Sequence, residues 1–208
     1  MSPTGSGELQ PQFMGDLATL PPHAHGNRSL TWWGMMGMIA IEGTAFVLAV
    51  ATYFYLANQS PDWPPDALLP ELLPGILFTA LLLVSVIPNV WLQRVAEAEK
   101  PQPVRIALVV MSLFGAALVV IRYFEFPALL VTWDRSAYGS ILVTLLGLHT
   151  VHLVTDLIDT LVLTVLMMTG HGKGRRFVDV AENAIYWNFV VITWIPIYLV
   201  VYFAARWL

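Results

Sequence analysis

Residues 138–168 form a long apolar run that decides the fold class of this chain, and they read YGSILVTLLGLHTVHLVTDLIDTLVLTVLMM. Four ionisable residues lie within the run, spaced three, four and three positions apart: His149, His152, Asp156 and Asp159. A helix turns about 100° per residue, so this spacing places all four side chains on one stripe less than about 90° wide. Ionisable groups are costly in hydrocarbon. We therefore expect the run to span a membrane, with its stripe facing protein or water.

The composition agrees with a membrane protein. Of 208 residues, 57% are hydrophobic and only 12% are charged, and the mean hydropathy is +0.69. The chain has no Cys, which excludes disulfides, thiolate metal ligands and a thiol nucleophile. It also has no Gly-rich phosphate loop, no Ser-His-Asp pattern and no basic patch for nucleic acid, so we expect neither a self-contained enzyme nor a nucleic-acid-binding protein.

Five apolar runs are long enough to cross a bilayer, which takes about 20 helical residues. They cover residues 31–56, 71–92, 104–124, 138–168 and 180–206. The sequence thus predicts an all-α membrane protein, with a flexible Pro- and Gly-rich cytoplasmic tail over residues 1–30 and a bundle of five transmembrane helices over residues 31–208. We expect Pro101 and Pro103 to break the chain between the second and third spans.

The distribution of basic residues predicts the orientation of these spans. Seven basic residues fall on the side of the N-terminus, namely Arg28, Arg94, Lys100, Arg105, Lys173, Arg175 and Arg176. Three fall on the other side, namely Arg122, Arg135 and Arg206. Because basic residues concentrate in cytoplasmic loops, we expect a cytoplasmic N-terminus and a periplasmic C-terminus.

Depth in the membrane relates the first and fourth spans. Glu42 lies about ten residues, or roughly 15 Å, from the cytoplasmic start of its span, and His149 lies about eleven residues from the outer start of its own. Both should reach the midplane, where pairing offsets the cost of burying either group. We expect Glu42 to hydrogen-bond His149 or His152, and Asp156 and Asp159 to lie nearer the cytoplasm.

The polar seam is the name used below for the intramembrane set Glu42, His149, His152, Asp156 and Asp159. Its function is open between a hydrogen-bonded structural seam and a relay for proton or ion translocation. Metal or haem ligation is a weaker hypothesis, because two His residues on one turn do not bracket a haem and the Glu-x-x-His motif of di-iron bundles is absent. We therefore expect no metal or haem in this chain.

Three further polar residues mark span ends. Arg122 and Glu125 lie three positions apart near the end of the third span, close to a membrane interface, and Glu182 lies at the entry of the fifth.

Several short stretches match a known family in its own order. They are Trp33-Gly34-Met35, Ile41-Glu42-Gly43, Arg122-Tyr123-Phe124-Glu125-Phe126, the run from Trp133 to Ser140, Gly147-Leu148-His149-Thr150-Val151-His152, and Glu182 followed by Tyr186-Trp187-Asn188-Phe189. With them the chain resembles subunit III of the haem-copper terminal oxidases, the cytochrome c oxidase type. Family members commonly have seven helices, and this chain corresponds to the last five. Asn188 and Val191 replace a His and an Asp that are frequent in the family, so no role of those two groups is carried over.

The resemblance implies an accessory, redox-silent subunit that is not catalytic alone. It implies packing against subunit I, association with subunit II and other respiratory subunits, bound phospholipid and support of proton uptake. Haem and copper are expected only in the partner subunits, and the expected location is a bacterial cytoplasmic (inner) membrane. The family's intramembrane glutamate falls on Glu42, and its penultimate-helix histidines fall on His149 and His152. The alternatives are a homologue in a nitric oxide reductase or a quinol oxidase, and a free-standing proton channel or transporter.

The predicted orientation can be tested with topology reporters. A reporter fused after Leu208 should report the periplasm, because five spans place the two termini on opposite sides. Reporters inserted at Lys100 or Arg175 should report the cytoplasm and serve as matched controls. A cytoplasmic C-terminus would contradict the count of five spans.

Overall fold

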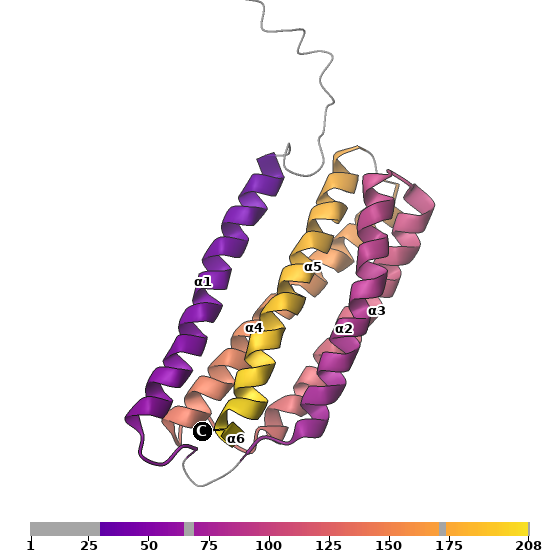
Figure 1. Ribbon diagram of the computed structural model, residues 1–208. Coiled ribbons are helices and arrows are strands. Elements are labelled where there is room, and N and C mark those ends of the chain that lie inside the picture. Colours follow the sequence, from indigo (N-terminus) through magenta and orange to yellow (C-terminus); the bar gives the residue numbers. More distant parts are fainter. Residues whose placement is uncertain (1–29, 65–68, 171–173, 208) are drawn as a thin grey trace, which may run out of the picture.

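The computed structural model describes residues 30–64, 69–170 and 174–207, and it is almost entirely helical over these ranges. The five long helices are α1 (Leu30–Gln59), α2 (Leu72–Glu97), α3 (Pro101–Ala128), α4 (Ala137–Met168) and α5 (Arg175–Leu199), as Figure 1 shows. A π-helical turn, η4 (Val200–Ala204), and the short α6 (Ala205–Trp207) continue α5. Each of the five regions is long and apolar enough to cross a membrane. The predicted fold class, an all-α protein with five membrane-spanning helices, is confirmed.

The helix ends differ from the predicted spans in one instructive place. We expected Pro101 and Pro103 to separate two helices, but both lie in the first turn of α3, which begins at Pro101. The first turn of a helix tolerates proline, since the missing N–H would have no partner inside the helix there. The break falls instead at residues 98–100, where the Lys100 amide donates to the Val95 carbonyl at 3.1 Å. Among the other boundaries, α2 ends at Glu97 rather than residue 92, and α5 begins at Arg175 rather than residue 180.

The predicted tail, residues 1–30, lies outside the described residues except for Leu30, the first residue of α1. The sequence-based division into a tail and a membrane domain stays a prediction, as does the orientation of the termini.

Helix α1 lies at one edge of the bundle, whereas α2 to α5 pack closely together (Figure 1). It packs on α4 and α5, while α2 packs between α3 and α5 and α3 also contacts α4. Only three residues of α1 are buried, Met35, Phe46 and Tyr53. The first helix is therefore attached to the others along a narrow face.

Gly75 of α2 and Gly139 of α4 each lie so close to a neighbouring group that a larger side chain would not fit. A Cβ atom at Gly75 of α2 would lie 2.7 Å from the hydroxyl oxygen of Tyr202 and would overlap its ring. A Cβ atom at Gly139 of α4 would overlap the backbone carbonyl of Thr132. Gly75 thus makes room for the Tyr202 side chain to cross α2 and enter the bundle.

Candidate functional site

A buried guanidinium lies at the centre of the polar network inside the bundle. Arg122 of α3 is 1% exposed, and its Nη1 donates to the carboxylate of Glu125 at 2.7 Å. The guanidinium carbon lies 3.7 Å from the centre of the Phe78 ring and 4.3 Å from that of Trp194. The charge is thereby paired with one carboxylate and enclosed by two aromatic faces, which attract cations. We predicted both residues near a membrane interface from their place in the sequence, and the structure adds that both side chains are completely buried.

His149 is the second partner of this arginine. Its Nδ1 lies 3.1 Å from Arg122 Nη2, and its Nε2 lies 3.0 Å from the carbonyl oxygen of Val190. A carbonyl can only accept a hydrogen bond, so Nε2 must carry the proton and Nδ1 must accept from the guanidinium. This geometry fits the neutral imidazole, because a proton on Nδ1 would point at the N–H groups of Arg122.

The π-helical turn completes the network. Tyr202, on η4, donates its hydroxyl hydrogen to Glu125 at 2.5 Å. Glu125 thus receives hydrogen bonds from Arg122 on one oxygen and from Tyr202 on the other. A π-helical turn adds a residue to the helical repeat and shifts side-chain directions beyond it.

Glu42 lies with a different histidine and has a partner that we did not predict. Its carboxylate accepts a hydrogen bond from the Tyr186 hydroxyl at 2.8 Å, and His152 Nε2 lies 3.7 Å away, too far for a hydrogen bond. The expected Glu42–histidine hydrogen bond is therefore wrong. His149 bonds Arg122 and Val190 instead, and His152 lies beside Glu42 with its Nδ1 2.6 Å from the Leu148 carbonyl oxygen. Of the predicted pairs, Glu42 and His152 do lie side by side between α1 and α4, whereas Glu42 and His149 do not pair.

The remaining members of the polar seam face different surroundings. Asp156 is 1% exposed, and its Oδ1 accepts from the Asn183 side chain at 3.1 Å. The Thr160 hydroxyl donates to the side-chain oxygen, Oδ1, of the same asparagine at 3.1 Å. Asp159 is exposed and lines a cavity. The stripe on α4 is thus divided among several separate contacts, and its function stays a prediction.

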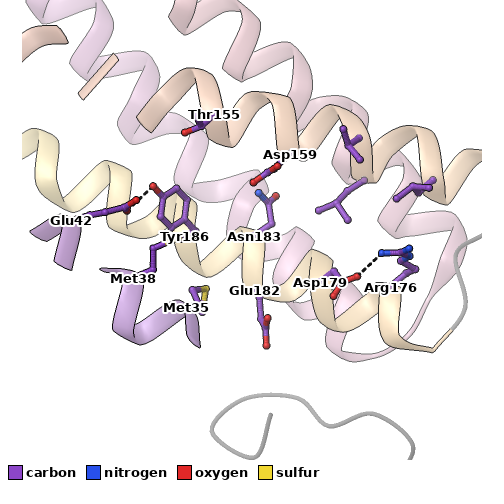
Figure 2. A pocket seen from close by; sticks show the side chains of 13 residues that line it. Met35, Met38, Glu42, Thr155, Asp159, Arg176, Asp179, Glu182, Asn183 and Tyr186 are labelled. Carbon is purple, nitrogen blue, oxygen red and sulfur yellow. Dashed lines mark hydrogen bonds and ion pairs between the residues drawn. The ribbon is translucent and has the colours of Figure 1, made fainter. Parts of the chain in front are cut away.

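The cavity that Asp159 lines has a volume of about 530 Å³ and lies between α1, α4 and α5. Figure 2 shows Glu42 and Tyr186 at one end of it and the Arg176–Asp179 pair at the other. Its carboxylates are Glu42, Asp159, Asp179 and Glu182, and its apolar wall includes Met35 and Met38. Glu182 also accepts a hydrogen bond from Thr31 at 2.8 Å, which links the start of α1 to α5.

The sequence analysis missed a set of polar contacts between α2 and α5. Trp194 Nε1 donates to Thr79 at 2.8 Å, and Trp187 Nε1 donates to Ser85 at 2.9 Å. One turn further, Asn89 donates to the carbonyl of Ala184 at 2.8 Å. The spacing of Thr79, Ser85 and Asn89 along one side of α2 was the available signal. Buried Trp and Asn side chains need such partners.

Metal ligation has no support from the geometry of the described ranges. Within them, no group of three or more His, Asp or Glu side chains is arranged to hold a metal ion. His23, His25 and His171 lie outside these ranges. The expected absence of metal and haem from this chain stays a prediction.

These features define a multi-pass α-helical membrane protein with a buried ionic network and a carboxylate-lined cavity. The family model of cytochrome c oxidase subunit III matches residues 22–206, and the chain belongs to that family.

Named relatives come from two kinds of oxidase. Cytochrome c oxidase subunit 3 of Cyprinus carpio is 27% identical over 193 residues, which cover 88% of this chain and 71% of the relative. The same subunit of Drosophila yakuba is 26% identical over 179 residues, covering 82% and 68%. Cytochrome bo(3) ubiquinol oxidase subunit 3 of Pseudomonas aeruginosa is 28% identical over 184 residues, covering 86% and 88%.

Removing Arg122 should leave the Glu125 charge buried without its partner. We expect Arg122→Met to lower the free energy of unfolding by roughly 3–5 kcal/mol. The double variant Arg122→Met/Glu125→Gln should recover part of this loss, because it removes the charge and keeps an acceptor for Tyr202. Unfolding by denaturant in detergent micelles would measure both.

A matched control is the Arg176–Asp179 pair, which has the same spacing in sequence and a distance of 3.0 Å but an arginine that is 46% exposed. Arg176→Met should cost no more than about 1 kcal/mol. Equal losses for the two arginines would contradict a central role for Arg122.

Proposed function

We propose that this chain is the accessory subunit III of a bacterial haem-copper terminal oxidase in aerobic respiration. It holds no haem or copper itself, and subunits I and II carry the redox centres. The observation that carries the proposal is the family match over residues 22–206, nearly the whole chain. The helices supply the membrane setting that such a subunit needs.

The carboxylate-lined cavity supports a role in proton uptake. Four carboxylates line it, from Asp179 near the start of α5 to Glu42 of α1 (Figure 2). The positive-inside rule puts the Arg176 end at the cytoplasmic surface. Carboxylates clustered there can take protons from the cytoplasm and keep them near the oxidase. In this proposal the cavity stores protons, while the Glu42 contacts hold α1 in place.

The apolar outer surface supports packing against subunit I and contact with lipid. Large hydrophobic side chains are exposed along α1, including Ile41 at 76% and Val47 at 67%. Exposed apolar area of this kind has to be covered by hydrocarbon or by another protein. Phospholipid and neighbouring subunits would share this surface.

A quinol-fed oxidase is the second candidate. The alignment covers 88% of the Pseudomonas aeruginosa relative, which is named a ubiquinol oxidase subunit, and 68–71% of the two cytochrome c oxidase relatives above. The greater coverage of the ubiquinol oxidase relative makes a quinol-fed oxidase a specific alternative. Coverage alone does not identify the electron donor.

Copurification tests the proposal. An affinity tag on this chain should recover, after gentle solubilisation, a complex with haem and copper absorbance and oxidase turnover. Comparing turnover with a quinol and with a reduced cytochrome c then identifies the electron donor. A stable solitary oligomer without haem would contradict the proposal and favour a transporter.

Substitutions at Glu42 separate a structural contact from a proton relay. Glu42→Gln keeps an acceptor for the Tyr186 hydroxyl and should leave the complex intact. Glu42→Ala removes the acceptor and leaves the partly buried Tyr186 hydroxyl unpaired, at a cost of about 1 kcal/mol. The subunit should then loosen, with oxidase turnover falling over repeated cycles.

Tyr186→Phe removes the same hydrogen bond from the other side and is the matched control for Glu42→Ala. It should weaken the complex in the same direction. Immediate loss of proton pumping in Glu42→Gln, with the complex intact, would identify Glu42 as a relay and contradict the structural role.

A further inference from the structure

A second groove, of about 450 Å³, lies on the surface of α3 and the end of α4, and it shares no lining residue with the Glu42 cavity. It is lined by Gln102, Arg105, Ile106, Val109, Val110 and Met168. One end is polar and cationic, and the rest is apolar. The proton-uptake proposal gives this surface no role.

Arg105 is fixed in position at the polar end. Its Nε donates to the carbonyl oxygen of Met167 at 2.8 Å, and the side chain is half-buried. Met167 is in the last turn of α4, where carbonyl groups lack partners within the helix. The bond satisfies one such carbonyl and fixes the orientation of the planar guanidinium. The Nη1 and Nη2 groups have no hydrogen-bond partner among the described residues and keep four N–H donors for a ligand.

The groove beyond Arg105 is apolar. Ile106 and Met168 are 58% and 56% exposed, and Val109 and Val110 continue the same wall one turn further along α3. Arg105 and Val110 are five residues apart, or roughly 7 Å along the helix. A ligand that fits both ends must be an amphiphile with an anionic head and a hydrocarbon chain.

The surrounding charge favours an anionic phospholipid. Arg105 lies in the first turns of α3, directly after the connection that carries Glu99 and Lys100, with Arg94 and Glu97 in the last turn of α2, so basic residues outnumber acidic ones by three to two in this stretch. Basic clusters next to a membrane-spanning helix attract the anionic lipids of the cytoplasmic leaflet. A guanidinium also fits the two free oxygens of a phosphodiester, which accept its N–H groups in parallel.

We propose that the groove between α3 and α4 binds one anionic phospholipid, with its phosphodiester on Arg105 and one acyl chain along Ile106, Val109 and Val110. The proposal gives the lipid contact of the proposed function a specific place and rests on the membrane-spanning assignment. It does not depend on assembly with an oxidase. Gln102 lies beside the head and can donate a further hydrogen bond from its amide.

The test is retention of phosphatidylglycerol by the full-length chain, in whatever assembly it purifies, measured by native mass spectrometry after exchange into detergent with that lipid. The wild-type protein should retain one lipid that Arg105→Gln loses, with affinity falling about tenfold or more because a charge-assisted bidentate contact is lost. Arg175→Gln removes an exposed basic residue that does not line the groove, and it should leave retention unchanged. Equal retention in Arg105→Gln and wild type, or equal loss in both variants, would overturn the proposal.

A second pair of variants tests the apolar end without changing charge. Val110→Trp should fill the groove and reduce retention, whereas Val120→Trp places the same residue at a site on α3 that is 57% exposed and outside the groove. Inorganic phosphate should not displace the lipid, because it lacks the chain. Displacement by phosphate, or retention in both tryptophan variants, would contradict a lipid site. Failure to copurify with haem would leave this result unchanged, so the two proposals fail separately.

Discussion

The burial of the Arg122 guanidinium is the constraint on which the bundle depends. An arginine buried among membrane-spanning helices is costly unless it is paired and shielded, and here α2, α3, α4 and α5 each contribute one partner. Phe78 comes from α2, Glu125 from α3, His149 from α4 and Trp194 from α5. Van der Waals packing alone leaves several helix rotations nearly equivalent in lipid. The demand to satisfy one charge selects among them and thereby fixes which faces of the four helices meet.

The first helix is attached by different means. Its polar contacts to α5 are the Tyr186–Glu42 and Thr31–Glu182 hydrogen bonds, and Phe46 lies against the ring of His152 with centroids 4.8 Å apart. With few buried residues, α1 has less packing to stabilise it than the helices around Arg122. Segments with few buried contacts open at lower free energy than a well-packed core. The bundle therefore combines a strongly constrained four-helix part with a more weakly held helix that carries the intramembrane glutamate.

The sequence predicts the number and class of the helices because bilayer thickness sets the length of an apolar run. It predicts helix ends less well, since a proline such as Pro101 can lie either in a loop or in the first turn of a helix. For the site, counting residues gives depth but not the rotation of a helix about its axis. That is why depth alone left His149 and His152 as alternative partners of Glu42, whereas the rotation of α4 directs His149 to Arg122 and leaves His152 beside Glu42. Thr79 and Ser85 were missed because such hydroxyls usually bond to their own helix backbone, as Thr79 also does to Gly75.

The distance in sequence between Glu42 and Tyr186 has a consequence for biosynthesis. The two residues are 144 positions apart, on the first and the last membrane-spanning helix. At synthesis rates of roughly 5–20 residues per second, Tyr186 leaves the ribosome about 7–30 s after Glu42. During that interval the first helix has to stay in the membrane with its carboxyl group unbonded to its eventual donor. The Tyr186–Glu42 hydrogen bond, which helps to hold α1 in the bundle, can therefore form only after α5 has been synthesised and inserted.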